Sequence, residues 1–594
     1  MPAVYVPANP LVVQSDRSLL LEVDNSLFEE TRDALAEFAE LVKSPEHVHT
    51  YKLTPLSLWN AAAAGLSTDE IVDILARYSK YELPGNVVAD VRNYMGRYGR
   101  LKLHGDDSGL VLRSEDTMLL SELRHNKRVA PLLGPAVGDD AVQIDPAQRG
   151  HLKQALIKAG YPAEDLAGYV EGTPMGIHLR TATRDGQPFG LRPYQDGAAA
   201  AFHAGGSVRG GSGVVVLPCG AGKTVVGLRV LELVGAQTLI LTSSTVAVRQ
   251  WIEEILDKTD IPADQVGEYS GERKELRPVT VSTYQIVTHR STKDGPLAHF
   301  DLFTAHDWGL IVYDEVHLLP APVFRITAEI QARRRLGLTA TLVREDGRED
   351  DVFSLIGPKK FDAPWKDLER QGWIATAECH EIRLELPPDL RLPYAVAEDR
   401  DKYRIAAENP LKMDVVRALL DRHADDQVLV IGQYIEQLET VAGLLDAPLI
   451  TGKTPTRRRE ELYNAFRTGQ VRRLIVSKVA NFAIDLPDAN VAIQISGSFG
   501  SRQEEAQRLG RILRPKRDGS LAHFYSVVTK ETRDEDFSTK RQLFLTEQGY
   551  RYTISDADDL LPHALVLSQP LSLAGATNVT SANYRYPEKE LETS

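Results

Sequence analysis

The stretch from Leu217 to Thr224 is the part of the chain whose residue types and spacing could do chemistry. It reads Leu217, Pro218, Cys219, Gly220, Ala221, Gly222, Lys223 and Thr224. An apolar, β-branched run precedes it and apolar residues at helical spacing follow it, so the pattern predicts a strand, a glycine turn and a helix. The N–H groups of such a turn and the positive end of the helix together favour a bound phosphate.

Lys223 and Thr224 extend this prediction to a nucleotide and its metal ion. The lysine can reach the β- and γ-phosphates of ATP, and the Thr224 hydroxyl can ligate Mg²⁺. The strict phosphate-loop pattern has glycine where this chain has Leu217. The alternative is an ordinary glycine-rich turn, which the order Gly-x-Gly-Lys-Thr makes the weaker interpretation.

Two carboxylates, Asp314 and Glu315, end an apolar strand further along the chain. In a parallel sheet this end of the strand lies beside the phosphate loop. We expect Asp314 to hold Mg²⁺ and Glu315 to orient and deprotonate the attacking water. An Asp-Glu pair alone could equally be a solvated turn. Thr339 and Thr341, after the next strand, could relay the state of the γ-phosphate, although threonine is also common at strand ends.

Arginines and a glutamine elsewhere could complete such a site. Arg511 and Arg514 are three residues apart and share one face of a predicted helix. From there they could act as arginine fingers on the γ-phosphate, although a lone basic helix face is usually solvated. The amide of Gln195 offers a donor and an acceptor that suit the adenine edge, with Arg192 close by in sequence. This last signal is weak when taken alone.

The elements that must position these side chains are two sets of strands alternating with helices. Such alternation predicts parallel sheets, so the fold class is α/β with two sheet lobes in tandem. The first lobe covers residues 191–365 and carries the phosphate loop, and the second covers residues 366–555. The polar residues 556–594 are expected to form a disordered tail.

Residues 1–128 are predicted to form a small, mostly helical N-terminal domain. Capping patterns open helices at Ser26, Thr54 and Ser67. Alternating apolar residues over 100–113 indicate a β-hairpin, and helices followed by a hairpin favour a winged-helix-like module. A small protein-interaction domain fits about as well. Residues 129–190 are rich in glycine, proline and aspartate and are expected to be a small connecting module or linker.

Composition limits the class of protein. Lys and Arg total 69 and Asp and Glu total 83, so the formal net charge is 69 − 83 = −14. A nucleic-acid partner therefore needs a local basic groove, for which Arg457–Arg459 and Arg472–Arg473 are candidates. Two cysteines make a disulfide framework unlikely and favour a reducing compartment. No apolar run is long enough to span a bilayer, so we expect a cytoplasmic chain without a membrane partner.

The motifs resemble those of superfamily 2 helicases, and more closely those of the XPB family, the helicase subunit of transcription factor IIH with its bacterial and archaeal relatives. The resemblance covers roughly residues 20–125 and 190–555. The stretches that carry it are residues 47–54, 191–195, 217–224, 314–317, 336–346 and 507–511.

The resemblance implies two RecA-like lobes and ATP-driven movement on DNA with 3′ to 5′ polarity. It assigns Arg344, Glu345 and Asp346 to strand opening, because they match the family's Arg-Glu-Asp motif. It also implies that Asp485 belongs to the fifth motif beside the nucleotide, and that a short thumb-like insert falls near residues 387–412. A prokaryotic-type member is expected to be nucleoid-associated.

These observations together predict a DNA-stimulated ATPase and 3′–5′ DNA helicase that uses ATP and Mg²⁺. Its substrate would be single-stranded and duplex DNA junctions, in DNA repair or transcription-linked strand opening. Two alternatives stay open. One is a double-stranded DNA translocase, and the other is an ATP-driven conformational switch that anchors a nuclease or another repair partner through residues 1–128.

Overall fold

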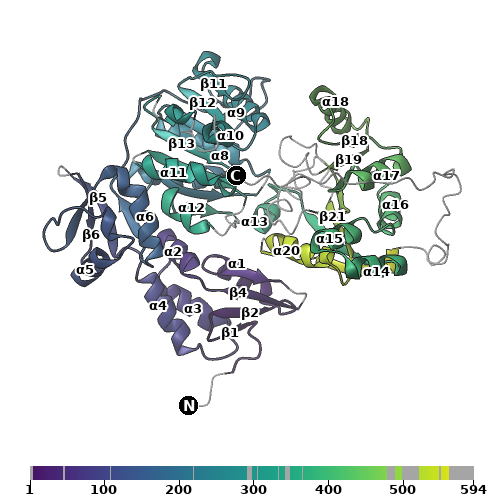
Figure 1. The fold of residues 1–594 in the computed structure, drawn as a ribbon, viewed down its shortest axis with the longest axis horizontal. Coiled ribbons are helices and arrows are strands. Elements are labelled where there is room, and N and C mark those ends of the chain that lie inside the picture. Colours follow the sequence, from purple (N-terminus) through teal and green to yellow (C-terminus); the bar gives the residue numbers. More distant parts are fainter. Residues whose placement is uncertain are drawn as a thin grey trace, which may run out of the picture.

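The computed structural model describes residues 5–44, 47–106, 109–218, 220–290, 298–303, 305–331, 333–340, 348–363, 365–477, 489–497, 521–547, 550 and 552–560. These residues contain two sheets of seven strands and two sheets of four strands (Figure 1). None of the helices they form has the length and apolar character needed to cross a membrane.

Lobe one is built on a parallel sheet of seven strands. The strands are β9 (Ser212–Val216), β10 (Thr238–Thr242), β11 (Val266–Tyr269), β12 (Val279–Thr283), β13 (Leu310–Asp314), β14 (Arg334–Thr339) and β15 (Lys359–Asp362). The helices are α7 (Pro193–His203), α8 (Lys223–Val234), α9 (Thr245–Lys258), α10 (Tyr284–Thr288), α11 (Ala321–Glu329), α12 (Glu349–Leu355) and α13 (Trp365–Arg370). The spatial order is β11-β12-β10-β13-β14-β9-β15.

Both faces of this sheet are buried, which explains its nearly continuous apolar strands. Along β9, Val215 packs in one core with α7, α8 and α9, whereas Val214 and Val216 pack in another with α10, α11 and α12. Alternate residues of a strand point to opposite faces. The sheet is therefore the middle layer of three, and its carboxyl-terminal edge is left for the loops.

Lobe two repeats the plan with a second parallel sheet of seven strands. The strands are β16 (Ala377–Leu384), β17 (Val428–Gly432), β18 (Leu449–Ile450), β19 (Arg473–Ser477), β20 (Val491–Gln494), β21 (Ala522–Thr529) and β22 (Tyr552–Asp556). The helices are α14 (Pro388–Val396), α15 (Asp399–Ala407), α16 (Lys412–Arg422), α17 (Ile435–Leu445), α18 (Thr456–Arg467), α20 (Arg533–Glu547) and α21 (Ala557–Leu560). The predicted thumb-like insert falls on α14 and α15, and α21 lies within the stretch expected to be a disordered tail.

The two lobes share one strand order. Lobe two is ordered β18-β19-β17-β20-β21-β16-β22. When the strands of each lobe are counted from its own first strand, both sheets read 3-4-2-5-6-1-7. The prediction of an α/β fold with two tandem parallel-sheet lobes is confirmed.

The N-terminal region contains more strand than the predicted, mostly helical module. Four strands form a sheet in the order β1-β2-β4-β3. They are β1 (Leu11–Val13), β2 (Ser18–Glu22), β3 (Glu40–Lys43) and β4 (Val48–Lys52). The helices are α1 (Phe28–Ala36), α2 (Pro55–Ala64), α3 (Thr68–Tyr78) and α4 (Gly85–Met95). The strands were missed because each is short and lies between strong helix-start signals such as the capping boxes of Thr54 and Ser67.

A second four-stranded sheet crosses the predicted boundary after residue 128. The expected hairpin is present as β5 (Leu101–Asp106) and β6 (Gly109–Arg113). It is extended by β7 (Ala141–Ile144) on one side and β8 (Ala163–Leu166) on the other, in the order β7-β6-β5-β8. The helices α5 (Thr117–His125) and α6 (Arg149–Lys158) share its core. Residues 129–166 thus complete this sheet and do not form a separate linker.

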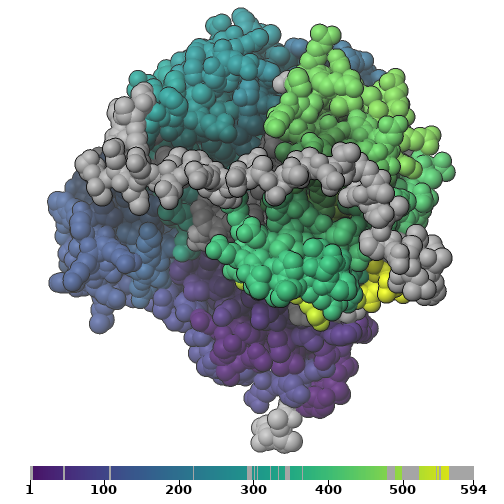
Figure 2. Space-filling view, turned by 45° about the vertical axis from the view of Figure 1, so that its right-hand side comes forward, coloured from purple at the N-terminus to yellow at the C-terminus, as the bar shows by residue number. Residues whose placement is uncertain are grey.

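The N-terminal region and the second small sheet both pack against lobe one (Figures 1 and 2). The α6 helix lies on α11 and α12, where Gln154 Nε2 donates to Asp351 Oδ1 at 2.7 Å. Trp59, Ile157 and Phe353 form an apolar cluster at this junction. On the other side, Leu543 of α20 packs into the N-terminal core, so the N-terminal region contacts both lobes.

Candidate nucleotide site

The phosphate loop joins β9 to α8 at the carboxyl-terminal edge of the lobe-one sheet. Gly220 and Gly222 have φ angles of +83° and +84°, a conformation that glycine adopts readily. A Cβ atom on Gly222 would come 2.5 Å from Gln195 Nε2. The positive φ angles therefore favour glycine there, and a Cβ at Gly222 would also displace the Gln195 amide, as in loops that turn their amides toward a phosphate.

Lys223, the first residue of α8, lies beside Glu315. Its Nζ is 3.3 Å from Glu315 Oε1, and the two side chains are 12% and 19% exposed. Glu315 has φ +51° and ψ +54°, a left-handed conformation that is uncommon for glutamate. Strain of this kind tends to be retained at functional sites. The structure thus brings together the lysine and the carboxylate that the sequence predicted to share this edge.

Asp314 is the last residue of β13, and both of its carboxylate oxygens accept hydrogen bonds. Trp251 Nε1 donates to Oδ2 at 2.9 Å, and the backbone N–H of Glu315 donates to Oδ1 at 3.1 Å. Burial, followed by the neighbouring Glu315 carboxylate, raises the pKa of Asp314 to about 6. Two adjacent carboxylates in a partly buried position favour a cation, because a cation offsets both charges.

His317 connects Glu315 to the end of β14. Its Nδ1 is 2.7 Å from Thr339 Oγ1 and 3.4 Å from Glu315 Oε2, and the ring is buried. Leu217, at the start of the phosphate loop, donates its N–H to the Thr339 carbonyl at 3.0 Å. Thr339 therefore contacts both the loop and, through His317, the carboxylate of Glu315.

Gln195 supports the phosphate loop from behind. Its Nε2 donates to the Ala221 carbonyl at 3.0 Å, and its Oε1 accepts from the Arg192 N–H at 2.9 Å. The Arg192 guanidinium lies 4.9 Å from the centre of the Trp373 ring and donates to Tyr194 Oη at 3.0 Å. The buried Gln195 amide thus already holds the loop backbone, a contact that the sequence prediction of adenine recognition did not include.

The residues present fit ATP and Mg²⁺. The glycine cradle, Gly220–Gly222, has room for a Cβ at Gly222 only if the Gln195 amide moves, and Lys223 offers a cation at the start of a twelve-residue helix. Asp314 offers carboxylate oxygen and Thr224, the second residue of α8, offers hydroxyl oxygen. Oxygen ligands of this kind are those that Mg²⁺ prefers.

Comparison with known proteins identifies the family. Residues 368–564 match the ERCC3/RAD25/XPB C-terminal helicase family. Residues 188–344 match the type III restriction enzyme, res subunit, and residues 11–137 match a helicase conserved C-terminal domain.

Similar proteins agree over nearly the whole length. The DNA 3′-5′ helicase XPB of Kineococcus radiotolerans is 57% identical over 93% of this chain and 97% of its own. The protein of the same name from Mycobacterium tuberculosis is 55% identical over 94% of this chain and 99% of its own. The chain belongs to the XPB family of DNA helicases. As a member of this family it is an ATP-hydrolysing enzyme.

A more distant XPB relative is named as both a helicase and a translocase. The general transcription and DNA repair factor IIH helicase/translocase subunit XPB/SSL2 of Saccharomyces cerevisiae is 31% identical over 91% of this chain and 71% of its own. The similarity thus extends across both lobes and the N-terminal region. The resemblance to XPB that the motifs predicted is confirmed.

Part of the predicted XPB-type site lies outside the described residues. This part comprises Cys219, Arg344, Glu345, Asp346, Asp485, Arg511 and Arg514. Their assignments to the phosphate loop, strand opening, nucleotide binding and the arginine fingers stay predictions. Leu217, Pro218 and the other residues of the loop are described, and they lie at the end of β9 as expected.

Sequence reasoning missed two residues of this XPB site. The sequence alone assigns no role to Trp251 at this site, but its indole N–H donates to Asp314. His317 falls within the stretch 314–317 that carries the resemblance, but the sequence does not predict that it bridges Glu315 and Thr339. Its place two residues after Glu315 was an available signal, whereas nothing in the sequence pairs Trp251 with Asp314.

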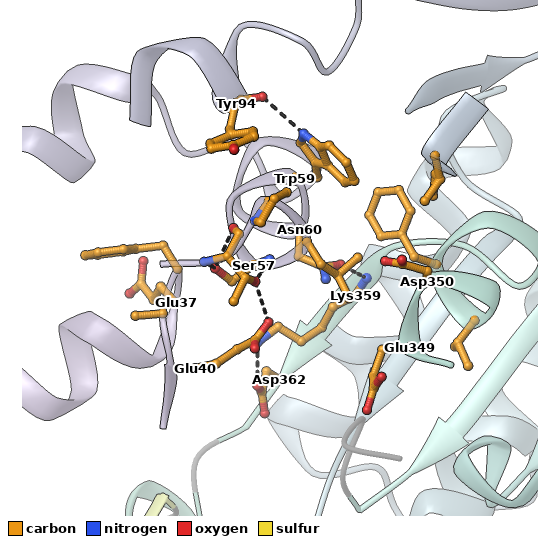
Figure 3. Close-up of a pocket in the computed structure, with 18 of the residues that line it drawn as sticks. Glu37, Glu40, Ser57, Trp59, Asn60, Tyr94, Glu349, Asp350, Lys359 and Asp362 are labelled. Carbon is orange, nitrogen blue, oxygen red and sulfur yellow. Dashed lines mark hydrogen bonds and ion pairs between the residues drawn. The ribbon is translucent and has the colours of Figure 1, made fainter. Parts of the chain in front are cut away.

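A cavity of about 860 Å³ lies elsewhere, between the N-terminal region and lobe one (Figure 3). Glu37 and Glu40 face it from the N-terminal region, and Glu349 and Asp350 face it from α12. Burial, followed by neighbouring carboxylates, raises the pKa of Asp350. Carboxylates outnumber the basic side chains of the lining, Arg97, Lys158 and Lys359. This acidic excess disfavours the phosphates of a nucleotide, so the phosphate loop is the better ATP site.

Proposed function

We propose that this chain is an ATP-driven DNA helicase that moves 3′ to 5′, with hydrolysis carried out at the edge of lobe one. The observation that carries the proposal is the meeting of Lys223, Asp314 and Glu315 beside the glycine cradle. Membership of the XPB family supplies the DNA substrate and the polarity.

Each residue of the described site has a role in this proposal. Lys223 binds the β- and γ-phosphates, and Thr224 and Asp314 hold Mg²⁺, which when bound neutralises phosphate charge. Glu315 orients the attacking water and accepts its proton. Trp251 and the Glu315 N–H fix the Asp314 carboxylate.

Residues of lobe two and of the Arg-Glu-Asp motif complete the motor. Arg511 and Arg514 act as arginine fingers on the γ-phosphate, and Asp485 lies beside the nucleotide. Arg344, Glu345 and Asp346 act in strand opening. Support for these assignments comes from the matching motifs in the sequence and from the equal strand order of the two lobes.

DNA would be gripped in part by lobe two. Arg457 and Arg458 at the start of α18 are 92% and 61% exposed. Exposed arginines of this kind can bind phosphates, and releasing counterions from DNA makes such binding weaken with salt. Both pair with Glu461 within 3.3 Å, and that surface pair is weak enough for a phosphate to replace it.

The biological setting is part of the proposal. DNA repair or transcription-linked strand opening fits the family, and the N-terminal region would dock a nuclease or another repair protein. Its contacts with both lobes, through α2 and α20, would let such a partner sense lobe movement. Association with the nucleoid would follow from DNA binding.

Strand displacement on tailed duplexes tests the proposal directly. The full-length chain with ATP and Mg²⁺ is expected to separate duplexes that carry a 3′ tail and to leave those with only a 5′ tail paired. Equal activity on both substrates, or displacement without ATP, would contradict it. Arg344→Ala is expected to keep ATP hydrolysis and to lose displacement, with the exposed Arg391→Ala as a matched control.

A double-stranded DNA translocase is the second candidate. It is favoured by the printed name of the yeast relative, which includes both helicase and translocase. Triplex displacement separates the candidates, because a translocase removes a third strand without opening the duplex below it. Triplex displacement without fork unwinding would favour the translocase.

A further inference from the structure

Two histidines and a glutamate meet at the opposite end of lobe two from the nucleotide edge. Glu378 and His380 are two residues apart on β16 and therefore lie on the same face of the sheet. His523 lies opposite Glu378 on the paired strand β21. One ligand atom of each lies within 4.8 Å of the others. All three are near the amino-terminal ends of their strands, whereas the nucleotide edge of a parallel sheet is at the carboxyl-terminal ends.

The distances in this cluster suit a shared metal ion better than direct hydrogen bonds. Glu378 Oε2 is 3.6 Å from His380 Nε2 and 3.5 Å from His523 Nδ1. Both distances exceed the range of a good hydrogen bond. Two ligand atoms bound at about 2.1 Å to a tetrahedral Zn²⁺ lie about 3.4 Å apart, which matches both distances.

The two ring nitrogens are buried and point at this space. Among the described residues, neither His380 Nε2 nor His523 Nδ1 has a hydrogen-bond partner. A buried polar atom without a partner costs free energy, and a metal ion would remove that cost at both rings. Burial, followed by a neighbouring imidazole, lowers the pKa of His380 and of His523.

Two residues at the end of α16, Arg422 and His423, lie beside this cluster. His423, directly after α16, lies 5.0 Å ring to ring from His523. Its nitrogens are taken by Tyr525 Oη at 2.9 Å and Asp426 Oδ2 at 2.8 Å, so it is a neighbour rather than a fourth ligand. Arg422 is close enough to lower the pKa of both ligand histidines, and the Glu378 carboxylate offsets its charge.

We propose that Glu378, His380 and His523 form a transition-metal site, with Zn²⁺ as the preferred ion. Imidazole and carboxylate suit Zn²⁺ better than Mg²⁺ or Ca²⁺, which take oxygen ligands. Three protein ligands leave a fourth position for water, and the Glu378 side chain is 50% exposed. Cys379 points to the other face of the strand and packs in the core, so it does not contribute.

A metal at this position would link two strands of the sheet. The first strand of lobe two, β16, would be tied to β21 close to where each begins. A ligand that binds the folded state alone stabilises it in proportion to the logarithm of its concentration. Zn²⁺ is therefore expected to raise the melting temperature of the full-length chain.

The test adds Zn²⁺ to full-length protein from which bound metal has first been removed with a chelator. Excess Mg²⁺ is present throughout so that it occupies the Mg²⁺ position at the nucleotide edge of lobe one. Wild type is expected to retain one Zn²⁺ per chain through gel filtration. The double variant His380→Gln/His523→Gln is expected to bind it at least about tenfold more weakly, since loss of an outer-shell partner alone costs about 10- to 100-fold. The exposed pair His47 and Asp24 gives a matched control, His47→Gln, which should bind as wild type.

A second variant and a second readout distinguish loss of the metal site from misfolding of the double variant. Glu378→Gln changes a half-exposed side chain and should also weaken Zn²⁺ binding. Co²⁺ in place of Zn²⁺ should give the visible absorption of a tetrahedral site in wild type and lose it in Glu378→Gln. Absence of retained Zn²⁺ in wild type, or undiminished retention in the double variant and Glu378→Gln, would overturn the site.

Discussion

Lobe one and lobe two share a strand order, yet each pairs a lysine with a carboxylate in a different way. In lobe one, Lys223 and Glu315 are 3.3 Å apart and remain 12% and 19% exposed. In lobe two, Lys412 and Asp534 are 2.6 Å apart and 0% and 1% exposed. The same strand order thus holds one lysine–carboxylate pair that a ligand can reach, in lobe one, and one that is fully buried, in lobe two.

The fully buried pair occupies the edge of lobe two that corresponds to the nucleotide edge of lobe one. The fifth strand of lobe one ends at Asp314, whereas the fifth strand of lobe two, β20, ends at Gln494. Lys412 Nζ donates to the carbonyl of Ile495, just beyond that strand, at 2.8 Å. Arg541 lies 2.7 Å from where a Cβ of Gly497 would be. Protein groups fill this edge, so the fold alone does not determine the chemistry.

Glu315→Gln should give the largest functional effect. The amide keeps the shape but cannot accept a proton from water, so kcat for ATP hydrolysis should fall by about 10²- to 10⁴-fold. Binding of a fluorescent ATP analogue should persist. Glu436→Gln, which changes an exposed carboxylate of lobe two, is the control. Hydrolysis by Glu315→Gln at the control rate would remove Glu315 from the reaction.

Lys412→Met should give the largest effect on stability. Removing Lys412 takes the nearest cation from the buried Asp534 carboxylate and leaves Arg541 at 4.0 Å from its Oδ1, at a cost of about 3–5 kcal/mol. Lys223→Met should change stability by less than about 1 kcal/mol, because its pair is partly exposed. Urea unfolding of the full-length variants measures both values. Similar losses from the two variants would erase the proposed difference between the lobes.

A compensating change sharpens that result. Adding Asp534→Asn to Lys412→Met removes the carboxylate charge that Lys412 balanced and keeps the acceptor for the Thr529 N–H. Arg541, at 4.0 Å, then faces an amide in place of a carboxylate. Part of the lost stability should therefore return. A double variant less stable than Lys412→Met would show that Asp534 stabilises the fold through Arg541 more than through Lys412.

Trp251→Phe should have a moderate effect confined to lobe one. Phenylalanine keeps an aromatic ring at this buried position but removes the hydrogen bond to Asp314. A hydrogen bond to a charged group contributes about 1.5–3 kcal/mol, so the Mg²⁺ concentration for half-maximal ATPase should rise at least tenfold. Trp308→Phe, which loses a bond to the Leu302 carbonyl, should leave the Mg²⁺ requirement unchanged.

Thr339→Val should have the smallest effect on hydrolysis. It removes the hydroxyl that contacts His317 but keeps the backbone carbonyl that accepts from Leu217. ATPase without DNA should change only a few-fold, whereas stimulation by DNA should fall more. Titrating DNA into the ATPase assay measures both, and a variant with full stimulation would exclude the His317 contact as a relay.

The comparison also explains which features the sequence could predict. The phosphate loop and Asp314-Glu315 were predictable because a glycine turn and a strand end have local signals. The partner of Asp314, Trp251, comes from another helix and depends on tertiary packing. The sheet formed by β5–β8 was split at residue 128 because β7 and β8 have four residues each and lie in a glycine- and proline-rich stretch.

The most direct test of the central claim is DNA-stimulated ATP hydrolysis by Lys223→Met in full-length protein with wild-type urea stability. If the ATP site is the cradle of lobe one, turnover should fall at least about 100-fold, because the cation that binds the transferred phosphate is gone. Turnover close to wild type in that folded variant would contradict the account.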